Sequence, residues 1–191
     1  MARNERVIVR PRSVMSGEGK RDRVAALLCA VVLLAACDTR SDPRAAVWTS
    51  PIAFDTASVT IYHDGDSVRL LTEIAASPQQ QQFGLMVRPS LDSMSSMIFV
   101  YESEQDATRG FWMHRTLVPL DIAYIDSAGA IVSIREMAPC DVPDGQTCPS
   151  YLPGVPYWSA LEVNQGFFAE RGIGVGDTVK LQRSARDSGP R

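Results

Sequence analysis

The chain has 191 residues, of which 45% are hydrophobic, enough for one domain with a sizeable core. It carries 19 basic and 22 acidic residues, for a formal net charge of −3. An acidic balance argues against nucleic-acid binding and against electrostatic attachment to anionic lipid headgroups.

The first 36 residues have the pattern of a secretory signal. A basic stretch that ends at Arg23 precedes thirteen uncharged residues, "VAALLCAVVLLAA", a run too short for a membrane-spanning helix. The last residues of this run, with Cys37, look like a bacterial lipobox, "LAAC". We therefore expect residues 1–36 to be a lipoprotein signal peptide and Cys37 to be acylated. The alternative is a plain signal anchor with an unmodified cysteine, and the start codon could be Met1 or Met15.

A lipid on Cys37 would make this a protein of the bacterial cell envelope, facing the periplasm or the outside. Asp38, directly after the cysteine, slightly favours the inner membrane. The leader holds 7 of the 19 basic and 3 of the 22 acidic residues, so the remaining chain has 12 and 19, a formal charge of −7. The predicted partner is therefore the membrane, to which the protein is held by its N-terminal lipid and not by a basic patch.

The cysteines also bear on the compartment. Cys29 leaves with the signal and Cys37 carries lipid, so Cys140 and Cys148 remain in a compartment that permits disulfides. We expect them to pair. The alternative, a structural zinc site, would need more ligands than two thiolates with no histidine nearby. No metal and no cofactor is predicted.

The first half of the body predicts a tether followed by strands. Residues 37–56 are polar, contain two prolines and read as the tether. "SVTIYHDGDSVRLLTEIA" (58–75) predicts a hairpin around Asp64-Gly65. Ser77, Pro78 and Gln80 have the spacing of a capping box and predict a short helix. "SSMIFVY" (95–101) predicts a strand, followed by a polar excursion.

The second half continues in the same way. "FWMH" (111–114) predicts a strand, and residues 120–137 a second hairpin that turns at 127–129. Residues 138–158 hold five prolines and both cysteines, which predicts an irregular loop. A strand around "SALEVN" is then followed by a short helix, capped by Asn164 and ended by Gly172, and by a closing strand (177–183). Residues 184–191 read as a disordered tail.

This order predicts one globular domain over residues 57–183. Its fold class is mainly β: a compact antiparallel sandwich or barrel-like single domain with one or two short helices. Strands and helices do not alternate regularly, which counts against Rossmann and TIM-barrel folds.

Known catalytic motifs are missing from the chain. It has no nucleophile elbow, zinc-protease helix, Walker loop or dinucleotide fingerprint. The two histidines, His63 and His114, are too few for a multi-histidine metal centre. We expect His63, beside the Asp64-Gly65 turn, to be exposed to solvent.

Several segments, read in order, resemble domain-of-unknown-function family 192. They are "QQFGLMVRPSL", "SMIFVY", "GFWMHRTLVPLDIAYID", "ALEVNQG" and "RGIGVGDTV", and the resemblance covers about residues 58–182. The resemblance implies a compact, mainly-β domain that is often secreted or lipid-anchored, and it implies no established reaction. Where the family usually has Lys and Asn, this chain has His114 and Arg115.

The resemblance also marks the candidate site residues. The motif positions are Gly84, Leu85, Met86, Arg88, Phe111, Trp112, Met113, Thr116, Pro119, Leu120, Asp121, Glu162 and Gly166. The apolar ones most simply fill a core. Polar and aromatic ones are harder to bury without partners, and the candidate binding residues are Arg88, Trp112, His114, Asp121 and Glu162. Asp121 could be a structural carboxylate paired with Arg88 or Arg115, a polar anchor in a ligand pocket, or an acid–base group.

The leading hypothesis is a non-enzymatic envelope lipoprotein that binds a small ligand, a glycan or a partner protein. Trp112, Tyr151, Tyr157 and Trp158 are available for stacking. One alternative is a carboxylate-based hydrolase that acts on envelope glycans through Asp121 and Glu162. The other is a purely structural or assembly role.

Overall fold

The structure is a computed structural model that describes residues 49–143 and 147–183. These residues belong to one compact unit. The predicted signal peptide, Cys37, most of the tether and the tail lie outside the described residues. Among the residues that are described, no helix combines the length and the apolar character needed to cross a membrane.

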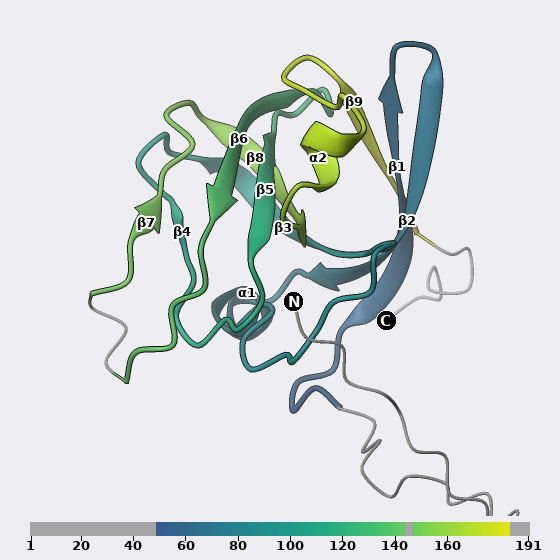
Figure 1. Ribbon diagram of the computed structural model, residues 1–191. Coiled ribbons are helices and arrows are strands. Elements are labelled where there is room, and N and C mark those ends of the chain that lie inside the picture. Colours follow the sequence, from purple (N-terminus) through teal and green to yellow (C-terminus); the bar gives the residue numbers. More distant parts are fainter. Residues whose placement is uncertain (1–48, 144–146, 184–191) are drawn as a thin grey trace, which may run out of the picture. The chain divides into compact units, whose positions relative to one another are not determined.

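The domain is mainly β, as predicted. Its elements in chain order (Figure 1) are β1 (Asp55–His63), β2 (Asp66–Ala75), α1 (Pro78–Phe83), β3 (Ser95–Gln105), β4 (Phe111–Trp112), β5 (Leu120–Ile125), β6 (Ile131–Met137), β7 (Ser150–Tyr151), β8 (Tyr157–Asn164), α2 (Phe167–Glu170) and β9 (Thr178–Arg183).

Seven strands form one mixed sheet in the order β6-β5-β8-β3-β2-β1-β9, and β4 pairs with β7 in a small second sheet. The expectation of a wholly antiparallel arrangement is wrong at one place, since β2 and β3 are parallel. Parallel strands need a crossover connection, and here the segment with α1 provides it. The β1–β2 hairpin turns at Asp64-Gly65, as predicted, with φ of 45° and 88°, which suits the tight turns that join twisted strands.

The large sheet curls so that its two edge strands approach each other at one end. An isolated bridge joins Ala130, just before β6, to Thr178 of β9, and the Val179 amide donates to the Gly129 carbonyl at 2.8 Å. The edges are not paired further along in the described residues. The sheet is therefore not a closed barrel.

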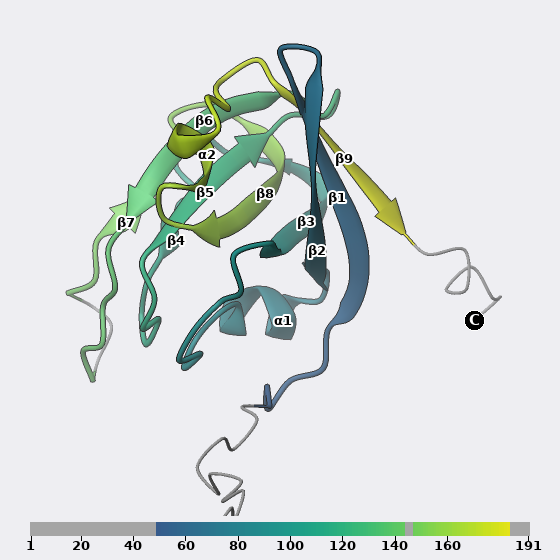
Figure 2. The same ribbon diagram turned by 45° about the vertical axis from the view of Figure 1, so that its right-hand side comes forward.

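Both faces of the central strands are covered. One apolar cluster includes Ile98, Leu161, Val163 and the two phenylalanines of α2, whereas the other includes Met97, Phe99, Leu120, Ile122 and Leu85, which follows α1. Alternate residues of one strand thus enter different clusters. In both views α1 and α2 lie well apart, toward the lower and upper ends of the strands (Figure 1, Figure 2). All six residues of β5 are buried.

The two helices differ in how well the sequence predicted them. In α1 the capping box forms, because the Gln80 amide donates to Ser77 Oγ and the Ser77 amide donates to Gln80 Oε1. In α2 the predicted cap is wrong. The N-cap is Gly166, and the Asn164 side chain instead donates to the carbonyls of Leu91 and Asp92 at 3.0 and 3.1 Å.

Two strand limits also differ from the prediction. Strand β3 continues through the expected polar excursion to Gln105, with an irregularity in its pairing to β8. The loop expected to be wholly irregular contains β7, which pairs with β4. Both differences come from pairing with strands that are distant in the sequence. His63 is only 25% exposed, since its Nδ1 lies 2.9 Å from Asp177 Oδ2, so the expectation that it is freely exposed is wrong.

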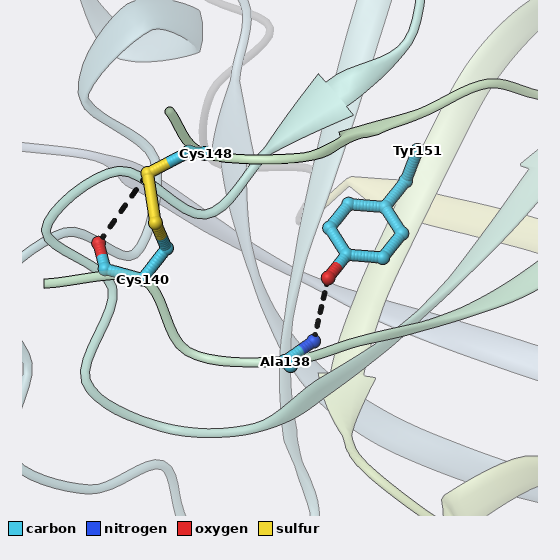
Figure 3. The surroundings of a disulfide bond; sticks show 4 residues. All are labelled: Ala138, Cys140, Cys148 and Tyr151. Atoms are coloured by element: carbon cyan, nitrogen blue, oxygen red, sulfur yellow. Dashed lines mark hydrogen bonds between the residues drawn. A yellow bond between two sulfur atoms is a disulfide. The ribbon is translucent and has the colours of Figure 1, made fainter. Parts of the chain in front are cut away.

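The predicted disulfide joins Cys140 to Cys148, with 5.9 Å between the Cα atoms. Figure 3 shows it beside the segment that leads from β6, where the Ala138 amide donates to the Tyr151 hydroxyl at 2.9 Å. The disulfide and this hydrogen bond join the two sides of the proline-rich loop, and β7 within that loop pairs with β4.

Candidate functional site

Three segments that are far apart in the sequence meet beside α1. They are the turn after α1 (84–88), the segment that begins with β4 (111–116) and the middle of β8, where Glu162 lies. In the sheet register Glu162 is paired with Met97 of β3 and Ile122 of β5. Cross-strand partners point to the same face, so Glu162 points to the face that carries Leu85 and Met113. The family-like motifs thus converge on one place.

A surface groove of about 410 Å³ lies at this place. Trp112 is its main aromatic wall and is 45% exposed, with its ring centroid 5.2 Å from that of His114. Two glutamines of α1, Gln79 and Gln82, also line the groove. The full lining is Ile52, Gln79, Gln82, Phe83, Met86, Trp112, His114 and Arg115.

Backbone hydrogen bonds connect the groove to the disulfide. The Val87 amide donates to the Arg115 carbonyl and the Arg115 amide donates to the Cys140 carbonyl, both at 2.8 Å. Val87 and Arg115 have φ of 54° and 55°, a region that non-glycine residues seldom adopt and that often occurs at functional sites. His114 Nε2 is buried, and among the described residues it has no hydrogen-bond partner.

A small cavity of about 30 Å³ adjoins the groove, because Gln82, Phe83, Met86 and Trp112 line both. Its other lining residues are Gln81, Gly84, Leu85, Phe99, Phe111, Thr116 and Glu162. Gly84 has φ of 51°, and a Cβ atom there would lie 3.2 Å from Phe99 Cζ. Glycine is therefore needed here for both backbone conformation and space.

Glu162 is the ionisable residue that lines this cavity, and it is buried, with only 4% exposure. Burial raises the pKa of Glu162 to about 8, and the positive charge of Arg88 opposes part of that rise. The carboxyl group is thus mostly protonated at neutral pH, and it can donate as well as accept a hydrogen bond.

Arg88, 9% exposed, links this cavity to a neighbouring hollow. Its guanidinium pairs with Glu73, and both residues line a pocket of about 380 Å³ between β2 and the segment 88–96. Glu73 is the cross-strand partner of Met97, which in turn is the partner of Glu162. Glu73, Met97 and Glu162 are therefore level with one another on adjacent strands. Glu73 was not among the residues predicted from the sequence, although an acidic residue between the apolar residues of β2 could have indicated a buried partner for an arginine.

Asp121 is not part of the site. Its neighbour Ile122 pairs with Glu162, so Asp121 itself points to the opposite face of the sheet. Asp121 Oδ2 accepts a hydrogen bond from the Gly166 amide at 2.9 Å, and the carboxyl group is 3% exposed. Burial raises the pKa of Asp121, while hydrogen bonds from backbone amides at Gly166 and Phe168 oppose the rise. Its role is to hold the turn that starts α2.

This placement corrects two predictions. Of the three roles considered for Asp121, the structural carboxylate fits, but its partner is the Gly166 backbone amide and not Arg88 or Arg115. Asp121 and Glu162 lie on opposite faces of one sheet, so they cannot flank the same glycosidic bond, and the paired-carboxylate hydrolase is wrong.

The aromatic residues expected to be available for stacking do not form one surface. Tyr157 is fully buried, and its hydroxyl donates to the Arg109 carbonyl at 2.9 Å. Trp158 lines a different cavity, beside Tyr101 and β9. Of these aromatic residues only Trp112 lies in the groove. Within residues 49–143 and 147–183, no three His, Cys, Asp or Glu side chains are grouped closely enough to hold a metal ion.

Comparison with known proteins shows the family of the chain. No curated protein matches the sequence. A solved structure of a proposed transcription regulator from Sinorhizobium meliloti 1021 is 27% identical, with a TM-score of 0.59 over 69% of this chain and 98% of that one. A protein of unknown function from Novosphingobium aromaticivorans DSM 12444 is 28% identical, with a TM-score of 0.58 over 70% of this chain and 91% of that one. Residues 59–181 match DUF192, described as an uncharacterized ACR, and the chain therefore belongs to domain-of-unknown-function family 192.

Proposed function

We propose that this protein is a non-enzymatic binding module of the bacterial cell envelope, anchored by a lipid on Cys37, and that the groove beside Trp112 binds a saccharide unit of an envelope glycan. The observation that carries the proposal is the convergence of three motif segments on one groove with a half-exposed tryptophan. Residues 84–88, 111–116 and Glu162 are separated in the sequence, yet residues from each of these segments line the groove, its cavity or the hollow beside it.

The chemistry of the groove supports a sugar ligand. Trp112 offers a flat apolar face on which the C–H side of a pyranose ring can lie, since aromatic rings combine large contact area with low loss of side-chain entropy. The side-chain amides of Gln79 and Gln82, which also line the groove, can each donate and accept hydrogen bonds. A concave site with an aromatic wall and a few polar groups is the usual design of a small-molecule site.

Binding is favoured over catalysis by the arrangement of ionisable groups. The two buried carboxylates point to opposite faces of the sheet. The groove contains one histidine and one arginine but no serine, cysteine or carboxylate beside the histidine, so a nucleophile with its base is not available there. The Sinorhizobium meliloti relative is described as a transcription regulator, but we do not propose that role for this protein. Its excess of acidic over basic residues disfavours binding to nucleic acid.

Binding is tested by calorimetric titration of the purified domain with oligosaccharides released from the producing cell's envelope. We expect Trp112→Ala to abolish binding, since a stacked aromatic anchor dominates such sites. Leu117→Ala is the matched control, because Leu117 is similarly exposed and lies outside the groove. Equal binding by both variants, or no binding by the parent, would refute the proposed site.

The anchor is tested separately in the producing bacterium. We expect mass spectrometry of the membrane fraction to find the mature N-terminus at Cys37 with attached acyl chains. Cys37→Ser should release the protein from the membrane or leave its leader uncleaved. An unmodified Cys37 in the native protein would refute the lipid anchor and leave the groove unaffected.

A further inference from the structure

The size and the lining of the small cavity beside the groove limit which saccharide can bind. We infer that it is a subsite for one small uncharged group of the ligand, a hydroxymethyl group that contacts Glu162, and that the ligand class is neutral hexoses. This inference rests on the proposed function, because it assumes that a sugar ring lies on Trp112. It goes beyond the proposed function by naming the substituent of the sugar that the site selects.

The size of the cavity sets the first limit. Its volume is about 30 Å³, and a water molecule needs roughly 10–15 Å³ by this measure. There is thus room for about two non-hydrogen atoms, which is the size of a hydroxymethyl group. A carboxylate substituent has one more atom than this, and a phosphate or an N-acetyl group is larger still.

The walls of the cavity set the second limit. Phe99, Phe111 and Leu85 are apolar, whereas Glu162 and Thr116 bring a carboxyl and a hydroxyl group. A hydroxymethyl group has the same division, with a carbon that can contact the rings and a hydroxyl that can exchange hydrogen bonds with Glu162. Trp112 lines both the cavity and the groove, so a ring lying on its face is next to the cavity.

The surrounding charges set the third limit. Glu162 faces the cavity from β8, Arg88 lies near it paired with Glu73 of β2, and Arg115 and His114 stand at the groove. A ligand carboxylate would bury a second acidic group against Glu162, and a ligand ammonium would meet a carboxyl group that is mostly protonated at neutral pH. Either charge would also lose its hydration in the cavity, which is costly without a close partner.

The protonation of Glu162 agrees with a neutral ligand. Burial raises the pKa of its carboxyl group to about 8, so at neutral pH the group can donate a hydrogen bond to a sugar oxygen. Above that pH an ionised Glu162 would only accept. An ionised Glu162 can still accept a hydrogen bond from the sugar hydroxyl, so the preference for the hydroxymethyl group should persist as the pH rises.

The test uses four methyl pyranosides that differ only in the substituent on carbon 5. Their binding to the whole domain is measured by ligand-observed NMR titration at pH 7. The substituents are hydroxymethyl, hydrogen (the pentoside), carboxylate and aminomethyl. We expect the hydroxymethyl sugar to bind about fivefold more tightly than the pentoside, which is the value of one net hydrogen bond. The carboxylate and aminomethyl sugars should bind more weakly than the pentoside.

Two variants locate the preference. Glu162→Leu should bind the hydroxymethyl sugar and the pentoside equally. Glu162→Gln keeps a hydrogen-bonding group of the same size and should retain the preference. If Glu162→Leu does not fold, the comparison of the four sugars with the parent and with Glu162→Gln still decides.

The outcomes separate the two proposals. Equal, Trp112-dependent binding of all four sugars overturns the subsite and leaves the saccharide groove intact. Tightest binding of the carboxylate or aminomethyl sugar overturns the neutral ligand class. Absence of binding by every member overturns the saccharide groove, and the subsite with it.

Discussion

The buried carboxyl group of Glu162 predicts an unusual dependence of folding stability on pH. In the folded protein its pKa is about 8, raised from 4.5 by burial. An acid whose pKa is raised by folding is protonated in the native state over a range where it is ionised in the unfolded chain. Its contribution to stability is therefore fully present below pH 4.5 and is lost as the pH rises toward 8.

The size of this effect follows from the two pKa values. Glu162 is almost wholly buried, so solvent screens little of the difference. Between pH 5 and pH 9 the parent should lose about 4 kcal/mol of unfolding free energy through this one group, since each pKa unit corresponds to about 1.4 kcal/mol. Glu162→Gln cannot ionise and should lack that loss.

The assay is urea denaturation of both proteins from pH 5 to pH 9, with the disulfide intact. The stability of Glu162→Gln relative to the parent should increase steadily with pH and level off above pH 8. Glu104→Gln, a change at an exposed carboxylate, is the control and should follow the parent throughout. Parallel curves for the parent and Glu162→Gln would show that Glu162 is ionised in the native state, and the reasoning about the cavity would be refuted.

Three further predictions concern the framework around the site. Asp121→Ala should lower the unfolding free energy by about 1–3 kcal/mol, because the Gly166 amide loses its partner, yet calorimetry should find ligand binding unchanged. Replacement of Cys140 and Cys148 by serine should cost about 2.5 kcal/mol for so short a loop, measured as a lower urea midpoint; an unchanged midpoint would contradict a stabilising bridge. Gly84→Ala should cost about 1–3 kcal/mol through backbone strain, and a thermal melt that matches the parent would show that the turn tolerates a side chain.

Much of the local structure was predictable from short-range chemistry. Asp64-Gly65 specified the first hairpin, and Ser77 with Gln80 specified the start of α1, because each signal acts over a few residues. The disulfide was predictable because only Cys140 and Cys148 remain once Cys29 is assigned to the predicted leader and Cys37 to the predicted lipid. Asn164 shows the limit of such reasoning: it has the chemistry of a helix cap, but carbonyls of a distant segment compete for its side chain and win.

The site itself was predictable only in part. Motif resemblance selected Arg88, Trp112, His114 and Glu162, all of which line the groove, the cavity or the adjoining hollow. It also selected Asp121, which lies on the other face. Period-two alternation within one strand says which residues share a face of that strand, but it does not say how two strands are aligned. The register of β5 with β8 decides that Asp121 and Glu162 are apart.

By itself the sequence determined the mainly-β character, the hairpins, the first helix, the disulfide and membership of a family, since these depend on local preferences and on residue identities. Only the tertiary structure decided the parallel pairing of β2 with β3, the curl that joins Ala130 to Thr178, and the meeting of Gly84, Trp112 and Glu162 around one cavity. Those features depend on contacts between residues far apart in the chain. The burial that raises the pKa of Glu162 belongs with them, because it is a property of everything packed around that side chain.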